Sequence, residues 1–195
     1  MLPRTGTPTP VMATPVFWFE DVLGAVAGDG LLGRIGEAAQ DLASSGAPGG
    51  GGPALLRLQA PELAEALALV TPIAQELLGT DGLAGSIEYA VTVHGTGQHT
   101  ALRTDAGPDG SAPGPVAFDY FLHRRPSRFS GGEHRIYDLC LRDGREELAR
   151  TFRDVYPDHD TLVLYPATSW YEVRLVQCPS GLDEDGRFAF HGWIS

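Results

Sequence analysis

Two pairs of polar residues have the spacing that places both members on one side of a β-strand. Arg103 and Asp105 are two residues apart, and His191 follows Arg187 by four. Alternate residues of a strand face the same side, so each pair would act together if it lies on a strand. A guanidinium suits the bidentate binding of a carboxylate, and an imidazole can move protons near neutral pH. The pairs therefore predict a site that binds an anion and transfers protons.

The second half of the chain has the pattern of short strands that could carry these residues. Apolar and β-branched segments alternate with clusters of Gly, Pro or Asp, which is typical of a β-sandwich or barrel. The expected strands are 87–93, 116–122, 134–139, 161–165, 171–176 and 188–194.

The first half of the chain predicts helices. Apolar residues recur at helical spacing across 17–43, and glycines at 28–30 would divide this segment into two short helices. A third apolar stripe runs over 61–79, where Pro72 is expected to kink or split the helix. The glycine-rich segment 44–53 is expected to be a flexible loop.

These patterns predict one domain over residues 16–195, preceded by a disordered leader at 1–15. A chain of 195 residues that is 43% hydrophobic can bury one substantial core. Residues 16–85 would form a helical buttress, and residues 86–195 the β core. The expected fold class is mainly β with N-terminal helices (α+β), with a jelly roll as its core.

Charge and composition exclude several classes of partner. With 14 Lys and Arg against 25 Asp and Glu, the net charge of -11 disfavours nucleic acid and anionic membrane surfaces. No apolar run is long enough to span a bilayer. Cys140 and Cys178 are too few for a disulfide framework, so a reducing cytoplasm is the expected location. We therefore expect a small anionic molecule as the partner, and a homodimer stays open.

Four segments of the second half resemble, in the same order, motifs of the iron(II)/2-oxoglutarate dioxygenase superfamily and its prolyl 4-hydroxylase branch. They are similar to a His-x-Asp block, a Phe-Ser-Gly-Gly-x-Leu strand start, a His-Glu-Val element and a closing strand with Arg and Gly-Trp. The resemblance implies a distorted double-stranded β-helix, a cupin-like jelly roll, whose mouth holds Fe(II) on two histidines and one carboxylate. The segments are VHGTGQHTALRTD (93–105), FSGGEHRIYD (129–138), DTLVLYPATSWYEVRLV (160–176) and GRFAFHGWI (186–194).

Carried over residue by residue, the resemblance replaces both iron-binding histidines. Arg103 and Asp105 fall on the ends of the His-x-Asp triplet, and Tyr171 falls on the second histidine, so only Asp105 keeps the family's residue type. Arg187 matches the residue that binds the distal carboxylate of 2-oxoglutarate. Because a cation at position 103 repels a metal ion, the ordinary iron site is expected to be lost, with Arg103 paired to Asp105.

The same resemblance directs further polar side chains toward this pocket. His134 stands where the family has a pocket-lining Leu, and His191 shares its strand face with Arg187. Convergence of these groups would make the pocket polar and titratable. We expect no metal ligand. The candidate catalytic residues are His134, His191, Tyr171 and Asp105, and the candidate substrate-binding residues are Arg187, Arg103 and Trp193.

Structural interpretations of the same residues stay open. Arg103 and Asp105 are equally explained by an ion pair at a strand start, and His134 and His191 by ordinary buried or surface histidines. Trp193 is more simply a packing residue. The remaining histidines are expected in loops or on the surface: His94, His99, His123 and His159.

Three functions follow from these alternatives. The first is a repurposed enzyme that needs no cofactor and performs non-oxidative chemistry on a small anionic metabolite in bacterial specialised biosynthesis, with a substrate carboxylate at Arg187. The second is an inactive binding or partner subunit. The third is an oxygenase that uses Fe(II) and 2-oxoglutarate with rearranged ligands, such as Asp105 with His134 or His191. Fold alone does not choose among them.

Overall fold

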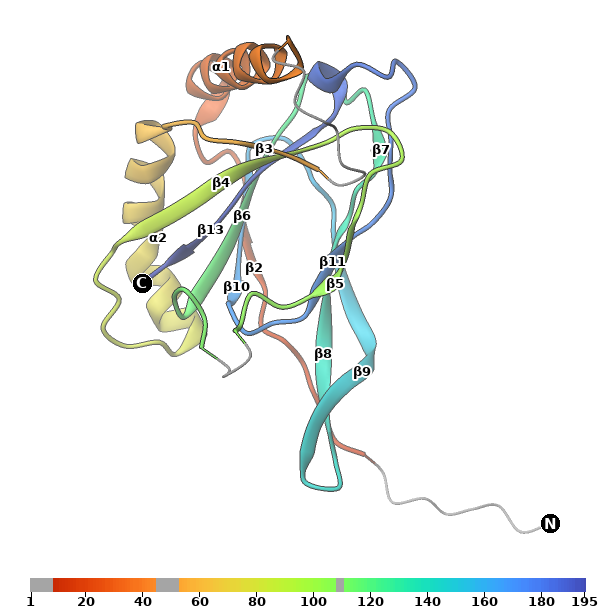
Figure 1. Ribbon diagram of the computed structural model, residues 1–195. Coiled ribbons are helices and arrows are strands. Elements are labelled where there is room, and N and C mark those ends of the chain that lie inside the picture. The colour runs from red at the N-terminus through yellow and green to blue at the C-terminus, as the bar shows by residue number, and fades with distance from the viewer. Residues whose placement is uncertain (1–8, 45–52, 108–110) are drawn as a thin grey trace, which may run out of the picture.

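The computed structural model describes residues 9–44, 53–107 and 111–195. Two antiparallel sheets face each other, and the two α-helices lie outside the larger sheet (Figure 1). This is a jelly roll of the double-stranded β-helix type with its α-helices in the N-terminal half. The expected fold class is therefore confirmed.

The strands divide into two sheets and a short additional pair. The larger sheet has the order β2 (Phe17–Phe19), β10 (Thr161–Pro166), β6 (Val116–Leu122), β13 (Arg187–Ile194), β4 (Ile87–His94) and β3 (Ala54–Leu56). The smaller sheet has the order β1 (Val11–Met12), β8 (His134–Arg142), β11 (Tyr171–Val173) and β5 (Thr100–Arg103), and β9 (Arg145–Val155) also pairs with β8. The short pair is β7 (Ser130–Gly131) with β12 (Val176–Gln177), and the helices are α1 (Gly24–Ser44), α2 (Pro61–Leu78) and the short 3-10 helix η1 (Asp183–Asp185).

Strand β13 shows how alternation separates the two faces of the larger sheet. Phe188 and Phe190 belong to the core that the helices cover. Ala189 and Trp193 belong to the second core, between the sheets. Arg187 is in phase with this second set, so the period of two directs the polar residues of β13 inward.

Helix α1 corrects the expectation of two short helices broken at 28–30. The helix runs unbroken over Gly24–Ser44. Gly28 is buried on the same stripe as Leu31 and Ile35, against the end of β6 and the segment before β10. Burial of this stripe outweighs the cost of about 1 kcal/mol for each helical glycine. The start of the segment is not helical either, because Phe17–Phe19 pairs with β10 as strand β2.

Helix α2 continues through Pro72, so the expected split is wrong. Proline removes the hydrogen bond to the carbonyl four residues earlier, at Ala68. Both Ala68 and Pro72 are exposed. Water can therefore satisfy the free carbonyl, and the buried residues on the opposite side, such as Leu63 and Leu67, stay in one continuous stripe.

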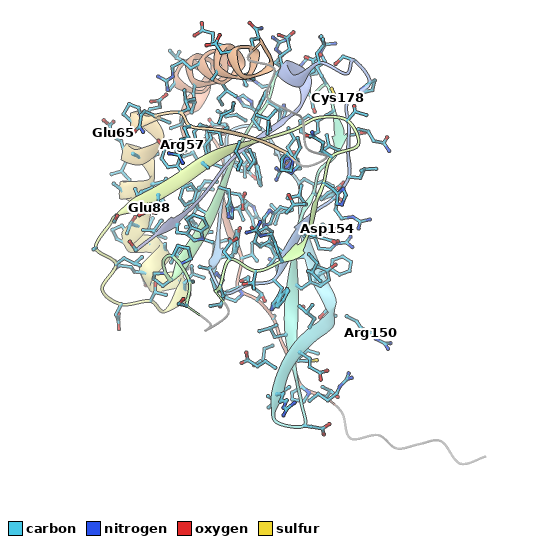
Figure 2. All side chains as sticks on the ribbon, viewed as in Figure 1. Arg57, Glu65, Glu88, Arg150, Asp154 and Cys178 are labelled. Atoms are coloured by element: carbon cyan, nitrogen blue, oxygen red, sulfur yellow. The ribbon has the colours of Figure 1, made fainter. Side chains whose placement is uncertain are left out.

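The longest strand, β9, is one that we did not expect. Its 11 residues are rich in charged side chains and mostly exposed, a composition atypical of strands. With β8 it forms a hairpin that projects away from the helices, and Arg150 points outward from it (Figure 2). Asp143 and Gly144 form the turn with φ of 51° and 75°. An Asp-Gly pair between strands is a hairpin signal that was available in the sequence.

The expected leader and loop fall partly outside the described residues. Of the leader at 1–15, residues 1–8 lie outside, while Val11–Met12 forms β1 and is not part of a leader. Of the loop at 44–53, residues 45–52 lie outside. In the described part of the chain, no helix is long and apolar enough to cross a membrane.

Candidate functional site

A cavity of about 770 Å³ opens between the two sheets and is lined by strands of both. It is formed by the inner faces of β4, β5, β6, β8, β11 and β13, so residues far apart in sequence meet there. Every site residue that the sequence suggested lines this cavity: Arg103, Asp105, His134, Tyr171, Arg187, His191 and Trp193. Their functional roles stay predictions, but their convergence is a property of the fold.

Arg187 is fully buried in the wall of this cavity. Its Nη1 lies 3.5 Å from Nδ1 of His94, and its guanidinium lies 4.9 Å from the ring centre of Phe121. Its Nε and Nη2 have no hydrogen-bond partner among the described residues. Burial lowers the pKa of Arg187 to about 10, and Asp119 opposes this shift, so the group stays charged at neutral pH.

Gly132 makes room for this arginine. A Cβ at Gly132 would lie 2.8 Å from Cδ of Arg187, and the φ of this residue is 75°. Glycine therefore serves both the backbone conformation and the close approach. Gly132 is therefore not only part of a strand start, because it also makes room for a side chain that lines the pocket.

Asp105, Tyr171 and His191 form a compact group on the other side of the cavity. The hydroxyl of Tyr171 donates to Oδ1 of Asp105 at 2.9 Å, and Nε2 of His191 lies 3.0 Å from Oδ2. Tyr171 Oη and His191 Nε2 are 3.5 Å apart. Arg103 approaches the same carboxylate at 3.3 Å, but its side chain is 57% exposed and lies at the rim. The expected pairing of Arg103 with Asp105 is present.

Asp119 is a site residue that we missed. It is buried on β6, accepts a hydrogen bond from the hydroxyl of Tyr165 at 2.7 Å, and lies 3.4 Å from Nδ1 of His191. His134 Nδ1 is 3.5 Å away on another side. Burial disfavours the charged form, but His134 and His191 outweigh it and hold the pKa of Asp119 below its usual range. A single charge inside the apolar segment VAFDYFL was the signal for it.

The two histidines beside Asp119 have opposite pKa shifts. For His191, burial favours the neutral form, but Asp119 and Asp105 outweigh it and raise the pKa to about 10. For His134, burial lowers the pKa to about 4 even though Asp119 opposes it. At neutral pH His191 is therefore an imidazolium between two carboxylates, whereas His134 is neutral and stacks on Tyr171 with ring centres 4.9 Å apart.

Two histidines expected in loops or on the surface are buried. His94 is 1% exposed at the end of β4, where burial and then Arg187 lower its pKa to about 3. His123 is buried after β6 and contacts the half-buried His159 edge to face. His99 is exposed, as expected, at the mouth of the cavity. The position of His94 beside Arg187 depends on the pairing of β4 with β13.

Comparisons with known proteins place this geometry in a familiar fold. No family model matches the sequence. Over 108 residues the chain is 31% identical to an uncharacterised PKHD-type hydroxylase of Synechocystis, a match that covers 55% of this chain and 36% of that relative. The crystal structure of a Pseudomonas putida prolyl-4-hydroxylase matches with a TM-score of 0.62 and 17% identity, over 93% of this chain and 92% of that one. A Burkholderia pseudomallei oxidoreductase of the 2OG-Fe(II) oxygenase family matches with a TM-score of 0.52 and 15% identity, over 92% and 84%.

These relatives correct our expectation that no cofactor is used. One is a PKHD-type hydroxylase and another is an oxygenase of the 2OG-Fe(II) family, and such proteins use Fe(II) and 2-oxoglutarate. The expectation rested on the replaced histidines alone. It treated the loss of two ligand types as the loss of the whole cofactor requirement, although the same resemblance matched Arg187 to the family's co-substrate arginine.

The residues of this cavity fit 2-oxoglutarate better than they fit Fe(II). The unpartnered Nε and Nη2 atoms of Arg187 fit a carboxylate such as that of 2-oxoglutarate. By the motif resemblance, the positions of the family's two-histidine, one-carboxylate iron set would hold Arg103, Asp105 and Tyr171, a set of side chains that does not fit an iron ion. Among the described residues, no three His, Cys, Asp or Glu side chains are arranged to hold a metal ion.

The architecture expected from the sequence agrees with that of the solved structures that match this chain. The solved structures are matched over nearly the whole chain, whereas the chain spans about a third of the hydroxylase relative. The resemblance stated from the sequence motifs is thus confirmed at the level of the fold. The chain has the fold of the iron(II)/2-oxoglutarate oxygenases of the prolyl 4-hydroxylase type.

Proposed function

We propose that this chain is an oxygenase-type enzyme that binds 2-oxoglutarate, or a closely similar dicarboxylic 2-oxo acid, through Arg187. The observation that carries the proposal is the buried guanidinium whose Nε and Nη2 have no partner among the described residues. An unpaired buried charge costs several kcal/mol, and a bidentate carboxylate offsets that cost directly. The names of the relatives favour a 2-oxo acid over other carboxylates.

The cavity has room for a second molecule beside the co-substrate. Its volume of about 770 Å³ lies in the upper part of the usual range for small-molecule pockets. Leu55 and Leu102 line it and are 65% and 40% exposed, so its mouth has an apolar part beside the polar His99 and Arg103. We infer a small organic substrate with an apolar part at the mouth, while Arg187 keeps the co-substrate at the base.

The chain's own residues would shape the charge of the cavity around the bound molecules. His191 is charged at neutral pH, and its two ring nitrogens face Asp105 and Asp119, so it neutralises and holds together these two carboxylates. The buried Asp119 accepts a hydrogen bond from Tyr165 and lies beside Nδ1 of His191, so it orients the imidazole of His191. We do not propose the metal-independent enzyme or the inactive partner subunit, because the names of the relatives favour an oxygenase.

Calorimetric titration with 2-oxoglutarate tests this function. We expect Arg187→Met to weaken binding by on the order of 10- to 100-fold, since a hydrogen bond to a charged group contributes about 1.5–3 kcal/mol. Arg187→Lys keeps the charge but loses the planar pair of donors, so its affinity should fall between the two. Arg150→Met is the matched control, because Arg150 is exposed on the β8–β9 hairpin.

The result that contradicts the proposal is equally direct. If Arg187→Met binds 2-oxoglutarate as tightly as the native protein does, the carboxylate does not meet this arginine. Succinate, which lacks the 2-oxo group, is the second ligand for the same titration. Binding of succinate with undiminished affinity would place a plain dicarboxylate, and not a 2-oxo acid, at Arg187.

A further inference from the structure

We propose that His94 is a positioning residue, which holds the guanidinium of Arg187 so that one of its edges faces a bound carboxylate. The inference rests on the proposed function, because it concerns the arginine that would bind 2-oxoglutarate. His94 does not contact the ligand itself in this proposal. It acts through Arg187, and Thr100 in turn holds His94.

The pairing of β4 with β13 places His94 beside Arg187. The two residues are direct partners in the antiparallel register, and each is 1% exposed. Direct partners in such a sheet have their side chains on the same face, with Cβ atoms about 4.5–5.5 Å apart. Both side chains line the cavity. The backbone of the larger sheet therefore fixes this contact.

The protonation states of the two side chains determine which of them donates. A guanidinium has donors but no acceptor, so Nδ1 of His94, which lies 3.5 Å from Nη1 of Arg187, can only accept. Acceptance by Nδ1 requires a neutral imidazole with its proton on Nε2. Burial, and after it Arg187, lowers the pKa of His94 to about 3, so the imidazole is neutral at neutral pH.

Thr100 holds the other nitrogen of His94. Nε2 of His94 lies 3.1 Å from Oγ1 of Thr100, the first residue of β5. With its proton on Nε2, the imidazole donates to this hydroxyl. Thr100 belongs to the smaller sheet, whereas His94 and Arg187 belong to the larger one. The three side chains therefore form a series of contacts that joins the two sheets across the cavity.

The turn that connects His94 to Thr100 is tied to the neighbouring strand β12. The N–H of Gly97 donates to the carbonyl of Val176 at 2.9 Å, and the N–H of Val176 donates back to the carbonyl of Gln98 at 2.9 Å. The φ of Gly97 is 79°, a conformation that glycine adopts without strain. These hydrogen bonds fix the position from which Thr100 can hold His94.

The contact with His94 leaves one complete edge of the guanidinium for a ligand. Nε and Nη2 of Arg187 have no hydrogen-bond partner among the described residues. Their N–H bonds lie on the same edge and are nearly parallel, the arrangement that meets both oxygens of a carboxylate. Gly132 lies against Cδ of Arg187, and the ring centre of Phe121 is 4.9 Å from the guanidinium. His94 completes these restraints at the Nη1 end.

Calorimetric titration of the protein and its variants with 2-oxoglutarate tests this role. Leucine removes the acceptor at a similar size, so we expect His94→Leu to weaken binding about three- to tenfold, the cost of ordering one free side chain on binding. Asparagine can place its side-chain oxygen near the position of Nδ1, so His94→Asn should stay within twofold of the native affinity. His123→Leu is the matched control and should also stay within twofold, because His123 is buried but is not among the residues that line the cavity.

A double-mutant cycle separates positioning from a general effect on stability. In the Arg187→Met background, His94→Leu should change the affinity less than twofold further, because no guanidinium remains to be oriented. Imidazole 15N chemical shifts of the native protein give a second measurement, which needs neither a variant nor a ligand. We expect a neutral His94 with its proton on Nε2.

The opposite results would overturn the proposal. Native affinity in His94→Leu, equal losses in His94→Leu and His94→Asn, or the same further loss in the Arg187→Met background would show that His94 does not act through Arg187. A proton on Nδ1 of His94 would reject the contact itself, and this measurement decides the point if His94→Leu does not fold. Weakened binding in Arg187→Met with native affinity in His94→Leu rejects only the role of His94. Native affinity in Arg187→Met rejects the proposed function, and the role of His94 with it.

Discussion

At the scale of single residues, the groups around the buried Asp119 determine whether the imidazoles of His134 and His191 are charged. His191 meets a second carboxylate, Asp105, and is therefore charged at neutral pH. Burial keeps His134 neutral, because it outweighs the attraction of Asp119 and Asp105, and Arg187 and His191 also disfavour the charged form. Two histidines with one shared neighbour thus hold different protonation states. A charged imidazolium and a neutral, stacked imidazole therefore result from the same residue type.

His94 predicts a measurable dependence of stability on pH. Its pKa falls from 6.5 to about 3 on folding, because burial and then Arg187 disfavour the imidazolium, with Asp119 opposing. The unfolded chain binds this proton below about pH 6.5, so the stability is fully present above that pH and is lost as the pH falls toward 3. From this residue alone we expect a loss of about 2 kcal/mol in unfolding free energy between pH 7.5 and pH 5.

Urea unfolding at pH 7.5 and pH 5 of the native protein and of His94→Asn checks this expectation. Asparagine does not titrate, so the variant should lose about 2 kcal/mol less than the native protein over the same interval. Buried carboxylates contribute to the acid dependence of both proteins, and the comparison removes their share. An identical pH dependence in the two proteins would show that His94 accepts a proton in the folded state.

At the scale of elements, the junction of helix α1 with the larger sheet depends on Asp160, just before β10. Its carboxylate accepts hydrogen bonds from the backbone N–H groups of Leu23 and Gly24 at 2.8 and 2.7 Å and from the hydroxyl of Tyr120 at 2.7 Å. One side chain therefore caps the start of α1 and ties it to β6. The φ of Asp160 is 60°, a conformation that Asp and Asn tolerate better than most residues.

Substitution of Asp160 separates its capping from its backbone role. We expect Asp160→Ala to lower the unfolding free energy by about 2–4 kcal/mol, because it loses the cap and adds backbone strain. Asp160→Asn keeps an acceptor oxygen and the tolerated φ, so a loss of about 1 kcal/mol is expected. Chemical denaturation monitored by circular dichroism measures both. Equal losses in the two variants would mean that the charge itself, and not the cap geometry, stabilises this junction.

At the scale of the whole molecule, the structure has two cores on opposite faces of one sheet. The core under α1 and α2 contains Leu63 and Leu67, whereas the core between the sheets contains Phe121 and Ala189 and borders the cavity. Strand β13 contributes to both. The helices can thus stabilise the sheet without touching the site, as Figure 1 shows from their position outside the larger sheet.

Leu67→Ala tests this separation of stability from binding. The side chain is fully buried under the helices, so its truncation should lower the unfolding free energy by about 2–5 kcal/mol. The dissociation constant for 2-oxoglutarate at 25 °C should stay within twofold of the native value, because Leu67 belongs to the core under the helices and is not among the residues that line the cavity. Thermal unfolding and calorimetry measure the two effects. A tenfold loss of affinity would show that the helices also set the shape of the cavity.

Local patterns in the sequence were enough to predict the strands of much of the β core. Strand β6 was expected at its observed bounds, and β4, β10 and β13 to within a residue or so, because each combines apolar residues with flanking turn residues. The order of the motifs placed Asp105, Tyr171 and Arg187 in one cavity. Strand alternation correctly joined Arg187 with His191. These features depend on short-range periodicity and residue types, which a single sequence displays.

Only the tertiary structure decided which groups meet across strands. Asp119 joined the site because β6 pairs with β13, which sets it opposite His191. His94 moved from a presumed loop to the side of Arg187 through the pairing of β4 with β13. Packing against the sheet kept α1 in one piece despite its glycines. Such contacts join residues far apart in the chain, and their energies depend on burial and on charged neighbours, neither of which has a local signature.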